Sequence, residues 1–220
     1  MTVGFRRLTA IGVSAAAILS VAACGSSSSS STKSTSTTAA ATSATTSGTT
    51  SATTSGSAPA TVIGRSTSLV VNPAITAALK HADITIAAVP PASTKTHNTL
   101  LIFPTSGGQI VTATVTGTVN DTGGVTFSHA GKSVKLTNFV VNTSTKQLTA
   151  EVGGQQVVVF DLNLASLKRA SGPKGTVVAS NIKLKTTPQL ASSLNSGLGV
   201  TTFKGGQTFG ILTLTIAVKP

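Results

Sequence analysis

The chain has 220 residues, a formal net charge of +12 at pH 7, one cysteine, and neither tryptophan nor tyrosine. A single cysteine excludes an internal disulfide. The missing indole and phenol rings remove the usual stacking platforms for bases and sugars, so the sequence predicts no nucleic acid partner.

Residues 1–23 have the pattern of an export signal. Arg6 and Arg7 give a basic start, and an apolar run from Ile11 to Ala23 follows. This run is too short to cross the ~30 Å hydrocarbon layer of a bilayer comfortably, and its small-residue end is typical of a cleaved signal.

The end of this segment, Val21, Ala22, Ala23 and Cys24, resembles the lipobox of bacterial lipoproteins. The resemblance implies cleavage before Cys24 and acylation of its thiol. Acyl chains inserted among the membrane lipids would then anchor the protein on the extracytoplasmic side of the bacterial cell membrane. The alternative is an ordinary secretory signal in which Cys24 has no special role.

Residues 24–60 are predicted to form a disordered tether. After the cysteine they are almost wholly Ser, Thr, Ala and Gly, and such a segment cannot bury enough apolar surface to offset its ordering entropy. A flexible chain of this length spans roughly 30–36 Å. Its hydroxyl groups could carry O-linked sugars, or it could be a plain spacer.

Residues 61–220 are predicted to form one mainly β domain, an antiparallel β-sandwich or barrel-like sheet with two short helices. Residues 111–119, 181–185 and 210–218 alternate apolar or small with polar side chains, which is typical of half-buried strands. Six phenylalanines join the aliphatic residues in the expected core. Segments rich in Gly, Asn, Ser or Thr predict turns at 106–108, 120–124, 129–132, 142–146 and 153–154.

The two helices are predicted from capping patterns. Asn72 and Thr187 are suitable N-caps, and Pro73 and Pro188 stand at the first helical position, where a missing N–H costs nothing. The two patterns form a weak internal repeat, which either duplication or packing explains.

The segment from Leu100 to Ile216 resembles the HtaA domain of bacterial surface proteins that take up haem. The resemblance rests on "LIFPTSGGQ", "TGTVNDTGGVTFSHAGKSVKLTNFVV", "QLTAEV", "TTPQLASSLN" and "FKGGQTFGILTLTI". It implies a β-rich domain exposed on the envelope. In that family a tyrosine holds the haem iron and a histidine supports it, and His129 falls at the position of that histidine. Because this sequence has no tyrosine, His129 is the only axial ligand that we would name if haem is a cofactor.

Other motifs favour turns or loops over chemistry. The Gly-Lys-Ser at 131–133 lacks the first glycine of a phosphate loop and leads into a predicted strand. Asp121 lies in an Asp-Thr-Gly sequence, but without a second copy it is better explained as a turn former. The S-x-x-K at 171–174 contains Gly172 and Pro173, which break helical spacing. The histidines have no metal-binding spacing, so we expect neither a metal site nor an enzyme.

Charge is the remaining feature of residues 61–220. Arg6, Arg7 and Lys33 lie outside this range, and removing them from the 16 basic residues leaves 13 against four acidic ones, or about +9. On an exported protein this favours anionic partners, either phospholipid headgroups or phosphate-rich cell-wall polymers. The alternative is that the lysines keep a β protein soluble and protect its strand edges.

Together these patterns predict a membrane-anchored lipoprotein of the cell envelope with a non-catalytic binding or structural domain. A haem-binding module of HtaA type is the alternative hypothesis. The sequence does not indicate the oligomeric state.

Overall fold

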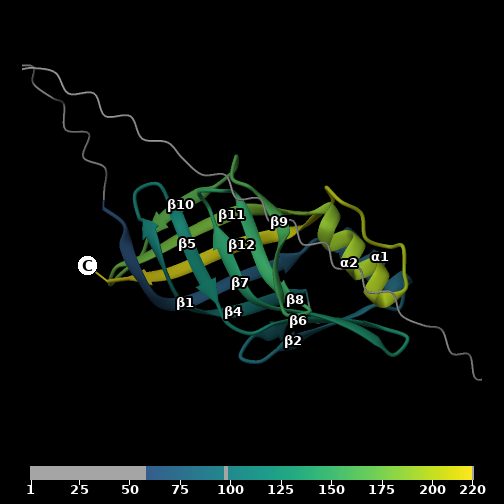
Figure 1. Cartoon of the computed structure of the whole chain (residues 1–220). Coiled ribbons are helices and arrows are strands. Elements are labelled where there is room, and N and C mark those ends of the chain that lie inside the picture. Colours follow the sequence, from purple (N-terminus) through teal and green to yellow (C-terminus); the bar gives the residue numbers. More distant parts are fainter. Residues whose placement is uncertain (1–57, 97–98, 220) are drawn as a thin grey trace, which may run out of the picture. The chain divides into compact units, whose positions relative to one another are not determined.

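The computed structural model describes residues 58–96 and 99–219 of the chain (Figure 1). The predicted signal segment, the lipobox with Cys24, most of the predicted tether and His97 lie outside the described residues.

The described residues form one antiparallel sheet, eight strands of which close into a barrel. Going round the barrel, the order is β7, β5, β4, β1, β12, β11, β9 and β8, and β8 pairs with β7 again. Of the remaining strands, β6 and β2 extend the sheet from β7, β3 pairs with β4, and β10 pairs with β11. The predicted β-rich, barrel-like domain with two short helices is confirmed. The strands are β1 (Ala60–Val71), β2 (Thr85–Val89), β3 (Ser93–Lys95), β4 (Leu100–Val111), β5 (Thr116–Asp121), β6 (Gly124–His129), β7 (Lys132–Asn142), β8 (Gln147–Val152), β9 (Gln155–Asn163), β10 (Lys168–Ser171), β11 (Thr176–Thr186) and β12 (Thr208–Val218).

The barrel interior is filled by alternate side chains of its strands, as the period-two patterns predict. In β11, for example, Ile182 and Leu184 are buried whereas Lys183 and Lys185 are exposed. Aromatic rings meet in the centre of the core, and Phe103 and Phe139 pack edge to face with their ring centroids 5.0 Å apart. All six phenylalanines of the domain are buried: Phe103, Phe127, Phe139, Phe160, Phe203 and Phe209.

Both predicted helices form, and both lie at the same end of the barrel (Figure 1). The first, α1 (Pro73–His81), begins after Asn72, whose Oδ1 accepts a hydrogen bond from the Ala74 N–H at 2.9 Å. The second, α2 (Pro188–Leu198), begins after Thr187, whose Oγ1 accepts from the Leu190 N–H at 3.2 Å. Within the described residues, neither helix has the length and hydropathy needed to cross a bilayer.

Two sequence predictions between residues 106 and 119 are wrong. Residues 111–119 do not form one strand, because the chain turns back between β4 and β5 at Thr112–Val115. Val115 has a positive φ of 57° and is buried, and its carbonyl accepts a hydrogen bond from the Thr143 hydroxyl at 2.6 Å.

The predicted turn at 106–108 is also wrong, because these residues lie inside β4. A Cβ on Gly108 would lie 2.2 Å from the Thr118 oxygen. Glycine is needed there so that two strand backbones can approach closely, which is its other common use besides turns. The predicted turns at 129–132, 142–146 and 153–154 are confirmed, with β6 and β7 joined through Ala130 and Gly131 and β8 and β9 through Gly153 and Gly154. At 120–124 only Thr122 and Gly123 lie between strands, and the strands that they join, β5 and β6, do not pair with each other.

The barrel wall splits at the helix end. Beyond the end of β5, one edge of β7 pairs with β6, which in turn pairs with β2, while β4 pairs with β3. In the described part of the chain, β2 therefore has one hydrogen-bonded edge and one free edge. The free edge of β2 lies beside the segment through which α1 leads into β2. The candidate site lies at this split end of the barrel.

Candidate functional site

An open cleft of about 330 Å³ lies between α1 and β2 at the split end of the barrel. Its apolar lining belongs to the domain core, and its polar side chains come from α1 and from the chain that leads into β2. The apolar lining residues are Val71, Leu79, Ile84 and Ile86, and the polar ones are Thr76, Lys80, Asp83 and Thr85.

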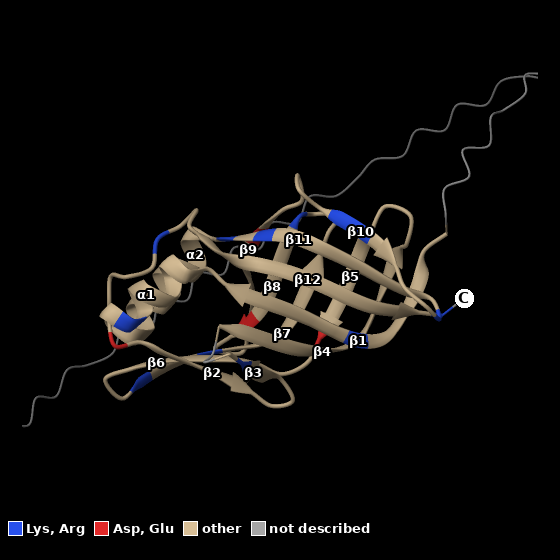
Figure 2. Cartoon of the chain, turned by 180° about the vertical axis from the view of Figure 1, so that it is seen from behind, with Lys and Arg blue, Asp and Glu red and all other residues tan. Residues whose placement is uncertain are grey.

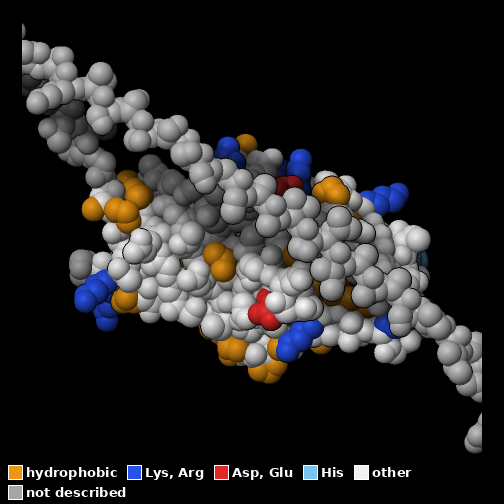
Figure 3. Space-filling model, in the orientation of Figure 1, with side chains coloured by type: hydrophobic (Ala, Val, Ile, Leu, Met, Phe, Trp, Pro, Cys, Tyr) orange, Lys and Arg blue, Asp and Glu red, His pale blue; other side chains and the backbone are white. Residues whose placement is uncertain are grey.

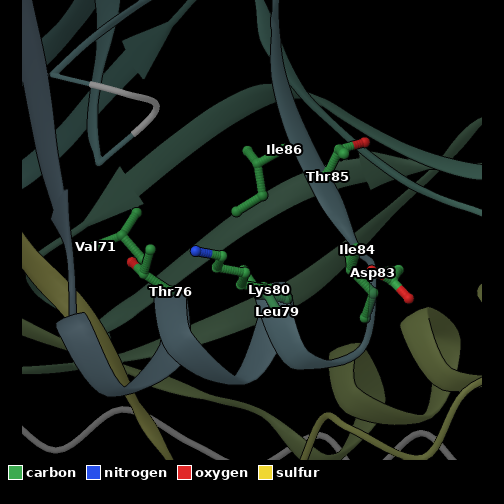
Figure 4. Close-up of a pocket in the computed structure, with 8 residues that line it drawn as sticks. All are labelled: Val71, Thr76, Leu79, Lys80, Asp83, Ile84, Thr85 and Ile86. Atoms are coloured by element: carbon green, nitrogen blue, oxygen red, sulfur yellow. The ribbon is translucent and has the colours of Figure 1, made fainter.

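Lys80 is the cationic group of this cleft. Figure 4 shows its side chain extending from α1 towards Val71 and Thr76, with Ile86 on the other side of the cleft. The Asp83 carboxylate lies at the opposite end and points away from the Lys80 amino group. An apolar surface with one ammonium group suits a ligand that has an apolar body and an anionic substituent.

His129 does not line this cleft. It is the last residue of β6, and its Nδ1 lies 3.2 Å from the carbonyl oxygen of Leu198, the last residue of α2. The carbonyl can only accept, so Nδ1 carries the proton and Nε2 is left for another partner. The Lys132 side chain, from the same hairpin, lies against Gly199 just after α2. Basic groups are favourable at this end of a helix because its free carbonyls carry partial negative charge.

The turn that follows His129 explains the Gly-Lys-Ser motif. Ala130 and Gly131 both have positive φ, 47° and 78°, as a tight hairpin requires. Lys132 and Ser133 then begin β7 and pair with His129 and Ser128 of β6. The motif is therefore a hairpin against the end of α2, and no helix follows it to bind phosphate.

The described residues do not fit haem in the α1–β2 cleft. Its lining has no histidine, cysteine, tyrosine or methionine, which are the usual iron ligands. The other candidate, His129, could offer Nε2, because the Nδ1 bond to Leu198 orients the ring as it does in many metal-binding histidines. Among the described residues, no three His, Cys, Asp or Glu side chains lie close enough together to hold a metal ion.

Asp121 is not the surface turn former that the sequence motif indicated. It ends β5 with its side chain inside the barrel, where it is 3% exposed. The Thr105 hydroxyl donates to its Oδ1 at 2.8 Å. The Thr67 hydroxyl lies beside the carboxyl, yet neither Thr67 Oγ1 nor Asp121 Oδ2 has a hydrogen-bond partner among the described residues. The alternation of β5, with Val119 and Asp121 two apart, was the signal that could have placed this carboxyl inside.

Burial changes the chemistry of Asp121. Desolvation raises its pKa from 3.8 to about 7, and the nearby Thr67 hydroxyl and the hydrogen bond from Thr105 only partly oppose this effect. The carboxyl faces an apolar cavity of about 20 Å³, which has room for about one water molecule. It is enclosed by the core and has no carboxylate partner there, so it cannot act on a substrate at the surface.

The comparisons with known proteins define the class of fold. The sequence matches no family model, and no curated protein matches it. The structure is similar to the crystal structure of the C-terminal domain of HtaA from Corynebacterium glutamicum, with a TM-score of 0.56 and 14% sequence identity over 73% of this chain and 99% of that domain. The chain therefore has an HtaA-like fold, which confirms the fold implied by the sequence resemblance.

Replacing Asp121 by asparagine is expected to change how stability depends on pH. Between about pH 4 and about pH 7 the carboxyl is protonated in the folded state and ionised in the unfolded chain. The folded state then binds more protons, so the free energy of unfolding of the wild type falls as pH rises, by up to ~1.4 kcal/mol per pH unit from this group. Asp121→Asn should lose this component when unfolding is measured by urea denaturation across that range.

The matched control is Asp161→Asn, because Asp161 is exposed on β9. It should keep the pH dependence of the wild type. If the free energy of unfolding changed equally with pH in the wild type and in Asp121→Asn, this result would contradict a buried carboxyl that is protonated in the folded state.

Proposed function

We propose that this chain is a lipid-anchored protein of the bacterial cell envelope whose barrel is a non-catalytic binding module. The extracytoplasmic location and the anchor are inferred from the lipobox at residues 21–24. What supports the binding role best is the charge of the domain, 13 basic against four acidic residues. One of the four, Asp121, is enclosed in the core and does not offset the positive surface.

The basic residues are spread over the domain. Figure 2 marks them on β1, β10 and β11 and in several loops. On the face seen in Figure 3, basic and hydrophobic side chains likewise lie in several separate groups. Such a distribution suits a long polyanion, such as a phosphate-rich polymer of the cell wall, better than one small charged ligand. The α1–β2 cleft, with Lys80, would serve a smaller ligand with an apolar body.

The anchor predicts a covalent change at Cys24. The native protein should be found in the membrane fraction with its first residue at Cys24 and with acyl chains attached, because two or more chains hold a protein stably at a bilayer. Intact-mass and peptide mass spectrometry measure this directly. The Cys24→Ser variant should carry no acyl chains. A free Cys24 thiol in the native protein would contradict the anchor.

Binding to the envelope polymers should depend on salt. We expect the Cys24→Ser chain to sediment with isolated cell walls at low salt and to be released as salt is raised, because screening shortens from ~10 Å at 0.1 M to ~3 Å at 1 M. Walls stripped of their anionic polymers are the control and should bind little. Binding that is insensitive to both salt and stripping would exclude the charge-led role.

Haem binding is the second candidate function. It is supported by the likeness to an HtaA domain and by His129, whose bond to the Leu198 carbonyl leaves Nε2 for coordination. If His129 is the ligand, haemin added to the protein should give a shifted Soret band that His129→Ala loses. His81→Ala, an exposed histidine at the end of α1, is the matched control and should keep the band. An unchanged haemin spectrum with the wild type, or an equal band in His129→Ala, would exclude this ligand.

A further inference from the structure

The exposed large hydrophobic side chains of the described residues are concentrated on two neighbouring strands. Ile63 and Val70 lie on β1 and Ile211 on β12, with exposed fractions of 61%, 51% and 40%. β1 and β12 pair along their length, and Val70 is directly opposite Ile211. Their neighbours in the chain, such as Leu69 and Leu212, are buried. The exposed residues therefore belong to the outer surface of the barrel.

The strand register extends this pair into a longer row. Leu100 on β4 lies opposite Val70, and Lys183 on β11 lies opposite Ile211. Lys95 on β3 in turn lies opposite Leu100. Since cross-strand partners point to the same face of a sheet, the outer surface carries a row of three apolar side chains with a lysine at each end. We call the outward residues of this row, together with Ile63, the β1–β12 wall.

The wall is hollowed where it meets the start of α1. A shallow depression of about 370 Å³ is lined by Val70, Ile211 and Lys183, together with Asn72, Pro73 and Thr208. Figure 2 shows β1, β12 and β11 side by side, with basic residues on β1 and β11. Lys185 also faces outward on β11, and the acidic group beside it is Asp161, its partner on β9.

We propose that the β1–β12 wall lies against an anionic phospholipid surface. The apolar row would enter the interface between headgroups and acyl chains, while Lys95 and Lys183 would contact lipid phosphates on either side. A cell-wall polymer also offers phosphate, but it has no apolar phase to receive Val70 and Ile211. The lysines at both ends of the row argue against a purely apolar protein partner.

The course of the chain supports this orientation. β1 begins at Ala60, directly after the segment that follows Cys24 in the sequence. If Cys24 is acylated, the first described strand after the anchor is thus the strand that carries Ile63 and Val70. The inference rests on the proposed function for the presence of a membrane close to the domain. The lipid contact itself does not need the acyl chains.

The test uses the full chain with Cys24→Ser, which removes both the acylation site and the only cysteine. A single new cysteine then carries a polarity-sensitive fluorophore, either at Ser68, which faces outward on β1 beside Thr213, or at Gln155, which is exposed at the start of β9 and is not part of the β1–β12 wall. We expect a blue shift of the label at residue 68 with phosphatidylcholine vesicles that contain phosphatidylglycerol. With phosphatidylcholine alone we expect no shift. The label at residue 155 should not shift with either.

Substitutions in the wall should weaken the vesicle response of the residue-68 label. Val70→Thr combined with Ile211→Thr keeps β-branched side chains, and we expect it to lower the apparent affinity about tenfold through lost apolar burial. Lys95→Gln with Lys183→Gln should lower it by a similar factor. Lys146→Gln, at an exposed turn between β7 and β8, is the matched charge control. Unchanged circular dichroism spectra and melting temperatures would show that the variants are folded.

Three results would overturn the proposal: equal shifts at residues 68 and 155, the same response to vesicles with and without phosphatidylglycerol, or unchanged affinity in both double variants. Because the tested chain has no Cys24, these outcomes do not depend on the anchor. An unacylated native protein would remove the proposed anchor and leave the vesicle result intact.

Discussion

The pairing of β7 with three other strands is the constraint on which the rest of the structure depends. The second half of β7 pairs with β5 on one edge and with β8 on the other, and this closes the barrel. Its first half pairs with β6 on the edge that β5 has left. The exchange occurs at Asn138, which has a positive φ of 53° and whose side-chain amide donates to Glu151 Oε2 at 2.7 Å. Near it, the Leu136 backbone oxygen would lie only 2.1 Å from a Cβ on Gly124, so β6 needs glycine to approach.

This exchange produces both an enclosed interior and an open end. Where β5 and β8 flank β7, the interior is closed, and loss of solvation there raises the pKa of the Asp121 carboxyl to about 7. Where β6 replaces β5, the wall divides and leaves the free edge of β2 beside α1. The closed part accounts for a perturbed carboxyl with no access to substrate, and the open part accounts for the cleft. The most perturbed group in the domain is therefore structural, which shows why an altered pKa alone does not identify an active site.

Local patterns predicted much of this fold, and contacts distant in sequence decided the rest. The helix caps at Asn72 and Thr187 were predictable because a cap depends on three or four adjacent residues. The turn at 112–115 was missed because the alternation of Thr with Val and Ala continues through it. The turn there is held by a contact distant in sequence, a hydrogen bond from Thr143, in the turn between β7 and β8, to the Val115 carbonyl. His129 could be placed in a hairpin, but its contact with Leu198 spans 69 positions and leaves no local signal. The α1–β2 cleft is likewise invisible in sequence, because its lining follows from where the barrel wall splits.

The end of β1 connects the two surfaces to which we assign roles. Val70 is exposed on the β1–β12 wall, whereas Val71, the next residue, is buried and lies between the depression of the wall and the α1–β2 cleft, both of which it lines. Because β1 leads into α1 through Asn72, the wall and the helix that carries Lys80 are parts of one continuous backbone segment. A bilayer bound at the β1–β12 wall would therefore lie beside the α1–β2 cleft, and this contact would fix the orientation of the cleft relative to the membrane. Cell-wall polymers would then contact the domain on the sides that face away from the bilayer, where β10 and the loops carry further basic residues. In this arrangement, lipid contact at the β1–β12 wall would leave β10 and these loops available to the polymer.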